Sequence, residues 1–202
     1  MVEAILIEVR KGKKVTAAFY GHPGVFACVA HRAIKQAKLE NINAHMEPGI
    51  SAEDCLYADL AIDPGKSGCM NLETSQFMFY QRNIDAAAHL ILWQVGLAGD
   101  KSLAKFSTGK AYRQVLVDLL LETYPADHQV ILYQAKVLPI ETVRAEHIAL
   151  ADLIHAELFM HATLVIPPSE TMQPNQAVLT KLALLDKQEL QSKHRPKLRL
   201  VL

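Results

Sequence analysis

Residues 19–26 read FYGHPGVF, a glycine- and proline-rich turn between two apolar segments. The segment Val15 to Tyr20 predicts a short buried strand before the turn, and apolar residues recur at helical spacing from Val25 to Ala37. The two glycines let the backbone approach a ligand closely, and the proline stiffens the turn. Because ligands of open parallel sheets bind beyond the carboxyl ends of the strands, we expect a ligand site here.

Residues 48–52, which read PGISA, predict a second strand-to-helix turn. A short strand is expected at Ala44 to Met46, and Ser51 with Asp54 predicts a capping box for the next helix, which should end near Ile62. Two such turns in one sheet indicate a shared crevice. The free N–H groups of the helix after the first turn could bind a ligand carboxylate. A simple tight connection is the alternative for either turn, because Gly and Pro punctuate all α/β folds.

The rest of the chain predicts three segments. Residues 1–86 should form a parallel α/β domain that is incomplete at its start, because the amphipathic helix from Val2 to Val9 opens without a capping residue. Residues 87–170, after a linker at Asn83 to Ala88, should form a mixed α+β domain. Residues 171–202 should be a helix, around Ala177 to Leu185, and a basic tail from Lys193 to Arg199. The elements expected in the second domain are strands at His89–Val95, Gln129–Tyr133 and Thr163–Ile166, and a helix at Tyr112–Leu120.

Charge and hydropathy exclude several classes of protein. The chain has 202 residues, with 21 Lys and Arg against 21 Asp and Glu, so no net charge attracts nucleic acid or an anionic membrane. Its longest apolar stretches, such as Leu90 to Val95, are too short to span a bilayer, and no signal peptide is visible. The three cysteines fit neither a zinc knuckle nor a disulfide framework. We therefore expect a cytoplasmic protein.

The sequence motifs of several enzyme classes are missing. No HExxH, nucleophile elbow, Walker loop or complete dinucleotide-binding fingerprint occurs, and His155 and His161 do not have the spacing of a helical metal pair. We therefore expect no metal site. His22 has three interpretations: a ligand contact, a general base or a residue that caps its turn.

The two turns resemble the tetrapyrrole methylase family, and most closely its borosin branch, whose members methylate backbone amides of a ribosomal peptide. The match rests on residues 19–26, 31–34 and 46–54, and it continues through residues 92–96 to Pro168. The resemblance implies the tetrapyrrole-methylase fold, with S-adenosylmethionine bound in the cleft between two domains. It also implies a homodimer.

The resemblance assigns cofactor contacts by position. Those in the first turn are Tyr20, His22, Val25 and Phe26. Those in the second turn are Ser51 and Ala52. The contacts from the other domain are Gln94, Ala135, Ala162 and Thr163.

Catalytic residues stay unassigned, because the family's opening strand, glycine-rich loop and amide-activating groups precede the helix with which this sequence begins. Tyr20 is the only nearby hydroxyl at a family-matched position. The basic tail has no apolar core-peptide run, so we expect the precursor peptide to be a separate chain. The alternatives are a small-molecule methylase acting on a tetrapyrrole precursor, against which the His22-Pro23 turn argues, and a non-catalytic or partner-dependent remnant.

Overall fold

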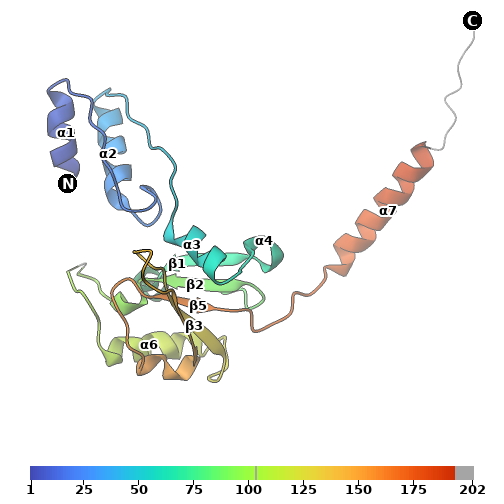
Figure 1. The fold of residues 1–202 in the computed structure, drawn as a ribbon. Helices are drawn as coiled ribbons and strands as arrows, with labels where there is room; N and C mark the ends of the chain where they lie inside the picture. The colour runs from blue at the N-terminus through green and yellow to red at the C-terminus, as the bar shows by residue number, and fades with distance from the viewer. Residues whose placement is uncertain (103, 194–202) are drawn as a thin grey trace, which may run out of the picture. The chain divides into compact units, whose positions relative to one another are not determined.

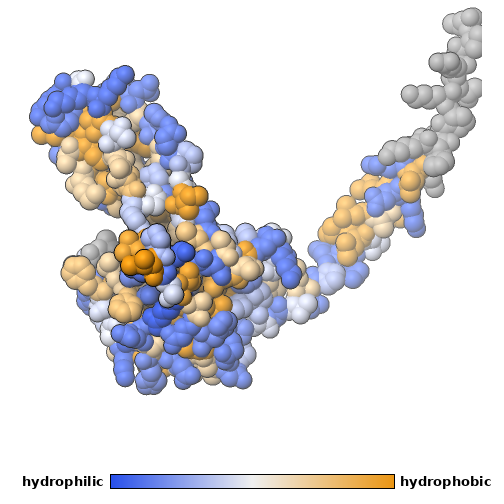
Figure 2. Space-filling view, viewed as in Figure 1, coloured by the Kyte–Doolittle hydropathy of each residue, from blue (hydrophilic) through white to orange (hydrophobic). Residues whose placement is uncertain are grey.

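The computed structural model describes residues 1–102 and 104–193, which divide into a compact unit at 1–169 and a second unit from Glu170 onward. The first unit holds a five-stranded sheet, and the second holds one helix, α7 (Gln176–Lys193) (Figure 1). Apolar side chains are exposed along α7, among them Leu179, Leu182 and Leu185 (Figure 2). Residues 194–199 of the basic tail lie outside the described part of the chain.

The sheet has the order β1-β2-β5-β3-β4. Its strands are β1 (Cys69–Glu73), β2 (His89–Trp93), β3 (Gln129–Gln134), β4 (Arg144–Ala149) and β5 (Thr163–Ile166). The β1–β2 pair is parallel and the other pairs are antiparallel. The predictions of β2, β3 and β5 are confirmed, since each is a short apolar run. The strands β1 and β4 were not predicted, because edge strands have half-exposed faces and lack such a run.

The central strands β2, β3 and β5 are buried on both faces, and successive side chains point to opposite faces. One face presents Leu92, Leu132 and Leu164 to the helices α5 (Thr74–Phe79) and α6 (Lys110–Leu120) and to the 3-10 helix η2 (Leu150–Ile154). The other face presents Ile91, Trp93, Ile131, Tyr133 and Val165 to Leu56 of α3 (Ala52–Asp59). Figure 1 shows α3 and α6 on opposite sides of the sheet. Each fully buried large apolar side chain contributes about 1.5–3 kcal/mol.

The strands predicted at Val15–Tyr20 and Ala44–Met46 are wrong. Both segments are irregular, and a strand forms only where a neighbour completes its hydrogen-bond ladder. Within residues 1–102 and 104–193, neither segment pairs with another strand. Along the chain, the helix α1 (Val2–Arg10) precedes the first of these segments and the helix α2 (Cys28–Leu39) follows it. The two helices pack against each other.

Three helix boundaries differ from the predictions. The helix α2 begins at Cys28 rather than Val25, because Phe26 has a left-handed φ of 49°. The helix α3 begins after Ser51 as predicted but ends at Asp59 rather than near Ile62, and the short helix α4 (Pro64–Ser67) follows. The helix α7 extends beyond its predicted end at Leu185.

The domain boundary at 86/87 stays a prediction. The strand β1 lies before that boundary and pairs with β2 after it, from Cys69 with His89 to Glu73 with Trp93. Within the described residues, no helix is long and apolar enough to cross a membrane.

Candidate functional site

The carboxyl ends of β1, β2 and β3 meet at one edge of the sheet, because β5 pairs antiparallel with both β2 and β3. Leu92 and Leu132 both pair with Leu164, so the residues just beyond them share this edge. The pairing continues past β2, where the Val95 N–H donates to the Ala162 carbonyl at 2.9 Å. Four expected cofactor residues are therefore neighbours at the edge: Gln94, Ala135, Ala162 and Thr163.

Gln94 turns the chain sharply at the end of β2. Its φ of 59° and ψ of 41° are left-handed, which is costly for a residue other than glycine. Contacts on both sides hold it there: the Thr74 hydroxyl donates to the Trp93 carbonyl at 2.6 Å, and the Leu97 N–H of the 3-10 helix η1 (Val95–Leu97) donates to the Gln94 carbonyl at 2.9 Å. The side chain of Gln94 is exposed at the edge.

Ala162 and Thr163 are 0% and 2% exposed, so both residues lie beneath the surface of this edge. The backbone before them lies against Gly96, where a Cβ atom would stand 2.3 Å from the Phe159 carbonyl oxygen. Only glycine allows this approach. This close backbone contact fixes the position of residues 159–162 relative to Gln94.

The first turn is held by two histidines around Gly24. The Gly24 N–H donates to His22 Nδ1 at 2.9 Å, and His31 Nε2 donates to the Gly24 carbonyl at 2.8 Å. Of the three interpretations of His22, capping is therefore the one with an observed contact. The turn also touches the second turn, since a Cβ atom on Gly49 would lie 3.4 Å from the His22 Cα.

The predicted capping box at the second turn is confirmed. The Ser51 N–H and hydroxyl donate to Asp54 Oδ2 at 2.6 Å and 2.7 Å, and the Asp54 N–H donates to Ser51 Oγ at 3.3 Å. The Ser51 backbone N–H is the main cause that lowers the pKa of Asp54, followed by the Ser51 hydroxyl. The Asp54 carboxylate therefore already occupies the α3 N-terminus. The α2 N-terminus, with Ala27 at the N-cap, has no side-chain cap and keeps its N–H groups available.

Phe26 joins the first turn to the sheet edge. Its ring centroid lies 5.6 Å from that of Trp93, tilted by 43°, and the residue stays 53% exposed. Tyr20 is 85% exposed and Val25 is half-buried, while Ala52 is exposed at the start of α3. The structure thus brings the two turns together, and it brings Phe26 next to Trp93, the last residue of β2, which Gln94 follows.

Sequence reasoning missed the polar residues beneath these turns. Glu53, Tyr57, Asn71 and Trp93 form one hydrogen-bond network between α3, β1 and β2. Trp93 could have been found as the only tryptophan, adjacent to Gln94. Asn71 could not have been found in this way, because its strand, β1, was not predicted.

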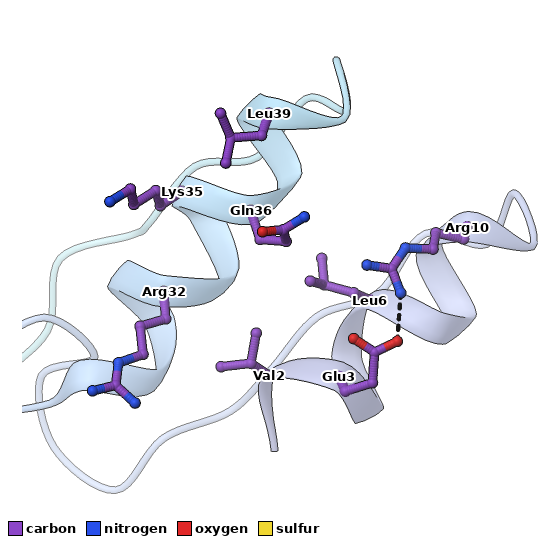
Figure 3. A pocket seen from close by; sticks show the side chains of 8 residues that line it. All are labelled: Val2, Glu3, Leu6, Arg10, Arg32, Lys35, Gln36 and Leu39. Atoms are coloured by element: carbon purple, nitrogen blue, oxygen red, sulfur yellow. Dashed lines mark hydrogen bonds and ion pairs between the residues drawn. The ribbon is translucent and has the colours of Figure 1, made fainter.

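Two cavities lie away from this edge. One, of about 640 Å³, lies between α1 and α2, where Arg10 pairs with Glu3 (Figure 3) and with Glu40. The other, of about 430 Å³, follows α5 and is lined by residues 77–84 with Leu119, Glu122 and Thr123. None of the ten expected cofactor residues lines either cavity. In the part of the chain that the structure describes, no three His, Cys, Asp or Glu side chains are grouped to hold a metal ion.

The relatives found by sequence have names that combine a methyltransferase with a peptide precursor. The chain is 43% identical over 191 residues to the methyltransferase/ribosomally synthesized cyclic peptide gymnopeptides precursor of Gymnopus fusipes. It is 40% identical to the corresponding omphalotin A precursor of Omphalotus olearius and 38% identical to a type I borosin precursor of Gymnopilus junonius. The Gymnopus match covers 92% of this chain but 45% of the relative, so the chain spans about half the length of such relatives. The resemblance to the borosin branch is confirmed.

Solved structures share the fold. The uroporphyrin-III-C-methyltransferase of Thermus thermophilus matches with a TM-score of 0.59 at 18% identity, over 83% of this chain and 70% of that one. The methyltransferase CobJ matches with a TM-score of 0.58 at 15% identity, over 86% and 74%. The family model for tetrapyrrole (corrin/porphyrin) methylases matches residues 1–150. The chain therefore belongs to the tetrapyrrole methylase family.

Proposed function

We propose that the chain acts as an S-adenosylmethionine-dependent methyltransferase that N-methylates backbone amides of a ribosomal precursor peptide. The observation that carries the proposal is the sheet edge described above. The expected cofactor residues from Phe26 to Thr163 are far apart in sequence, and they belong to the segments that meet there. Ligands of such folds bind beyond the carboxyl ends of strands.

The residues at the edge fit an adenosyl amino acid. Phe26 offers an exposed aromatic face for a flat base, and the small side chains of Ala52 and Ala135 leave room beside it. Gln94 offers both donors and an acceptor to polar groups, and the open α2 N-terminus suits a carboxylate. When bound, S-adenosylmethionine supplies a methyl group activated by its sulfonium.

The chain's own residues have to place a substrate nitrogen at about 3–3.5 Å from that methyl group. A backbone amide is a poor nucleophile, so its proton must be removed and the charge on its oxygen stabilised. Tyr20 is the hydroxyl at a family-matched position, and its exposure leaves it open to a peptide. The catalytic residues themselves stay unassigned.

We propose further that the precursor peptide is a separate molecule and that the chain works as a homodimer in the cytoplasm. In this respect the chain would differ from its relatives from Gymnopus and Omphalotus, whose names join methyltransferase and precursor in one protein. A methyltransferase site open to solvent at Tyr20 and Phe26 suits either arrangement.

A mass-spectrometric assay tests the proposal. The full chain is incubated with S-adenosylmethionine and a synthetic peptide that copies the precursor segment of the Gymnopus relative. A parallel reaction contains uroporphyrinogen III. We expect mass gains of one methyl unit on peptide backbone nitrogens. Methylation of the tetrapyrrole alone, or cofactor binding without any methyl transfer, would contradict the peptide substrate. A third reaction uses the chain with the same peptide fused to it, and methylation of the fused peptide alone would contradict the separate precursor.

A further inference from the structure

The amide of Asn71 lies at the centre of a hydrogen-bond network that joins three elements. Its Oδ1 accepts the indole N–H of Trp93 at 3.0 Å. Its Nδ2 donates to Glu53 Oε1 at 2.9 Å and to the Tyr57 hydroxyl oxygen at 3.1 Å. The Tyr57 hydroxyl donates in turn to Glu53 Oε1 at 2.6 Å. The elements joined are α3, β1 and β2.

Every hydrogen-bonding group of this amide has a partner. An asparagine side chain offers two N–H donors and one carbonyl oxygen, and here the donors face α3 while the oxygen faces Trp93. Burial, followed by the Glu53 carboxylate, raises the pKa of Tyr57, so its hydroxyl stays protonated and keeps donating. Partial burial also strengthens such bonds, because water competes less for them. The orientation of the amide is therefore fixed.

The network lies directly beneath the expected cofactor contacts. Trp93 holds the Phe26 ring at 5.6 Å and is followed in the chain by Gln94. The helix α3, which carries Glu53 and Tyr57, begins immediately after Ser51. A shift of α3 against β2 would thus move the second turn relative to both Phe26 and Gln94.

We infer that Asn71 is a positioning residue for the cofactor: its amide locks α3 to Trp93, and thereby sets the spacing between Ser51, Phe26 and Gln94. The inference rests on the proposed function. It does not make Asn71 a ligand of the cofactor, because the side chain acts through Trp93 and α3.

Trp93 is a built-in reporter, since it is the only tryptophan in the chain. Intrinsic fluorescence and the single indole N–H resonance therefore both report on the Asn71 contact. Phe26 covers the Trp93 ring and is half exposed, so a ligand that touches Phe26 will change the Trp93 signal.

The test titrates S-adenosylhomocysteine into the full chain and follows Trp93 fluorescence, with calorimetry for affinity. We expect Asn71→Leu to shift the emission and the indole N–H resonance of the free protein and to raise Kd about tenfold, because three hydrogen bonds are lost. Asn83→Leu is the matched control at an exposed asparagine, with Kd and Trp93 signals as in the parent chain. Tyr57→Phe keeps the packing, loses only hydroxyl bonds, and should weaken binding about threefold.

The outcomes separate this inference from the proposed function. A parent chain that binds no S-adenosylhomocysteine removes the proposed function and this inference with it. A parent that binds, with a folded Asn71→Leu variant whose Kd stays within about twofold, overturns the positioning role alone. Should Asn71→Leu not fold by circular dichroism, Tyr57→Phe decides: weaker binding at an unchanged melting temperature supports the role, and unchanged binding overturns it.

Discussion

Gly96 is the position where the smallest change should disturb the sheet edge most. In Gly96→Ala the new Cβ would lie 2.3 Å from the Phe159 carbonyl oxygen and 2.8 Å from its carbon. Ordinary contact begins at 3.4 Å, so one of the two backbones must retreat by about 1.1 Å. The φ of Gly96 is outside the left-handed region, so alanine can adopt this backbone and the cost is steric.

Overpacking of this kind costs about 1–3 kcal/mol, since backbone cannot move aside as a flexible side chain can. For a unit of 169 residues this lowers the melting temperature by roughly 2–4 °C per kcal/mol. The strain falls next to the hydrogen bond from the Val95 N–H to the Ala162 carbonyl, at 2.9 Å, which holds Ala162 beside Gln94. We therefore expect weaker binding of S-adenosylhomocysteine as well as lower stability.

The assay is thermal denaturation by circular dichroism together with calorimetric titration. Gly109→Ala is the control, because a Cβ atom added at this glycine would have no atom within 4 Å and its φ is −82°. The control should cost less than about 1 kcal/mol, chiefly through the weaker N-cap. A Gly96→Ala variant as stable as Gly109→Ala would refute the close approach of the two backbones.

Three further predictions concern contacts elsewhere in the first unit. Arg10 lowers the pKa of Glu40 from 4.5 to about 2. The ion pair therefore stabilises the α1–α2 contact fully above pH 4.5, and this stabilisation is lost as the pH falls toward 2. The melting-temperature gap between the parent and Glu40→Gln should therefore narrow from pH 6 to pH 3; a gap independent of pH contradicts the pairing. Ser51→Ala should lower the free energy of unfolding in urea by about 1 kcal/mol, because the capping box is lost, whereas Ser169→Ala, at an exposed serine, should have almost no effect. Tyr133→Phe removes the 2.8 Å bond to Asp59 and should cost about 0.5–1.5 kcal/mol in the same measurement; a variant as stable as the parent would show that this bond contributes nothing.

Local chemistry explains what could be predicted from the sequence. The capping box at Ser51 and Asp54 depends on residues three apart, and it forms as predicted. The strands β2, β3 and β5 are short apolar runs, and these too were predicted. The turn at residues 21–24 was predicted from its glycines and proline, and Gly21 there has a left-handed φ of 78°, which glycine adopts without strain.

Non-local pairing explains what could not be predicted. Val15–Tyr20 is apolar enough for a strand, yet it finds no partner within residues 1–102 and 104–193, so it stays irregular. The strand β1 is the converse: its sequence is mixed, and β2 supplies its ladder. No local sequence pattern predicts the strand register that makes Gln94 a neighbour of Ala162. Asn71 could not be predicted as a site residue, because its strand β1 was not predicted.

A crystal structure of the chain with S-adenosylhomocysteine would show directly where the cofactor binds. We predict that the ligand lies at the carboxyl edge of the sheet, in contact with Phe26, Gln94 and Ala135. A ligand seated instead in the cavity between α1 and α2, with that edge bare, would contradict the proposed site.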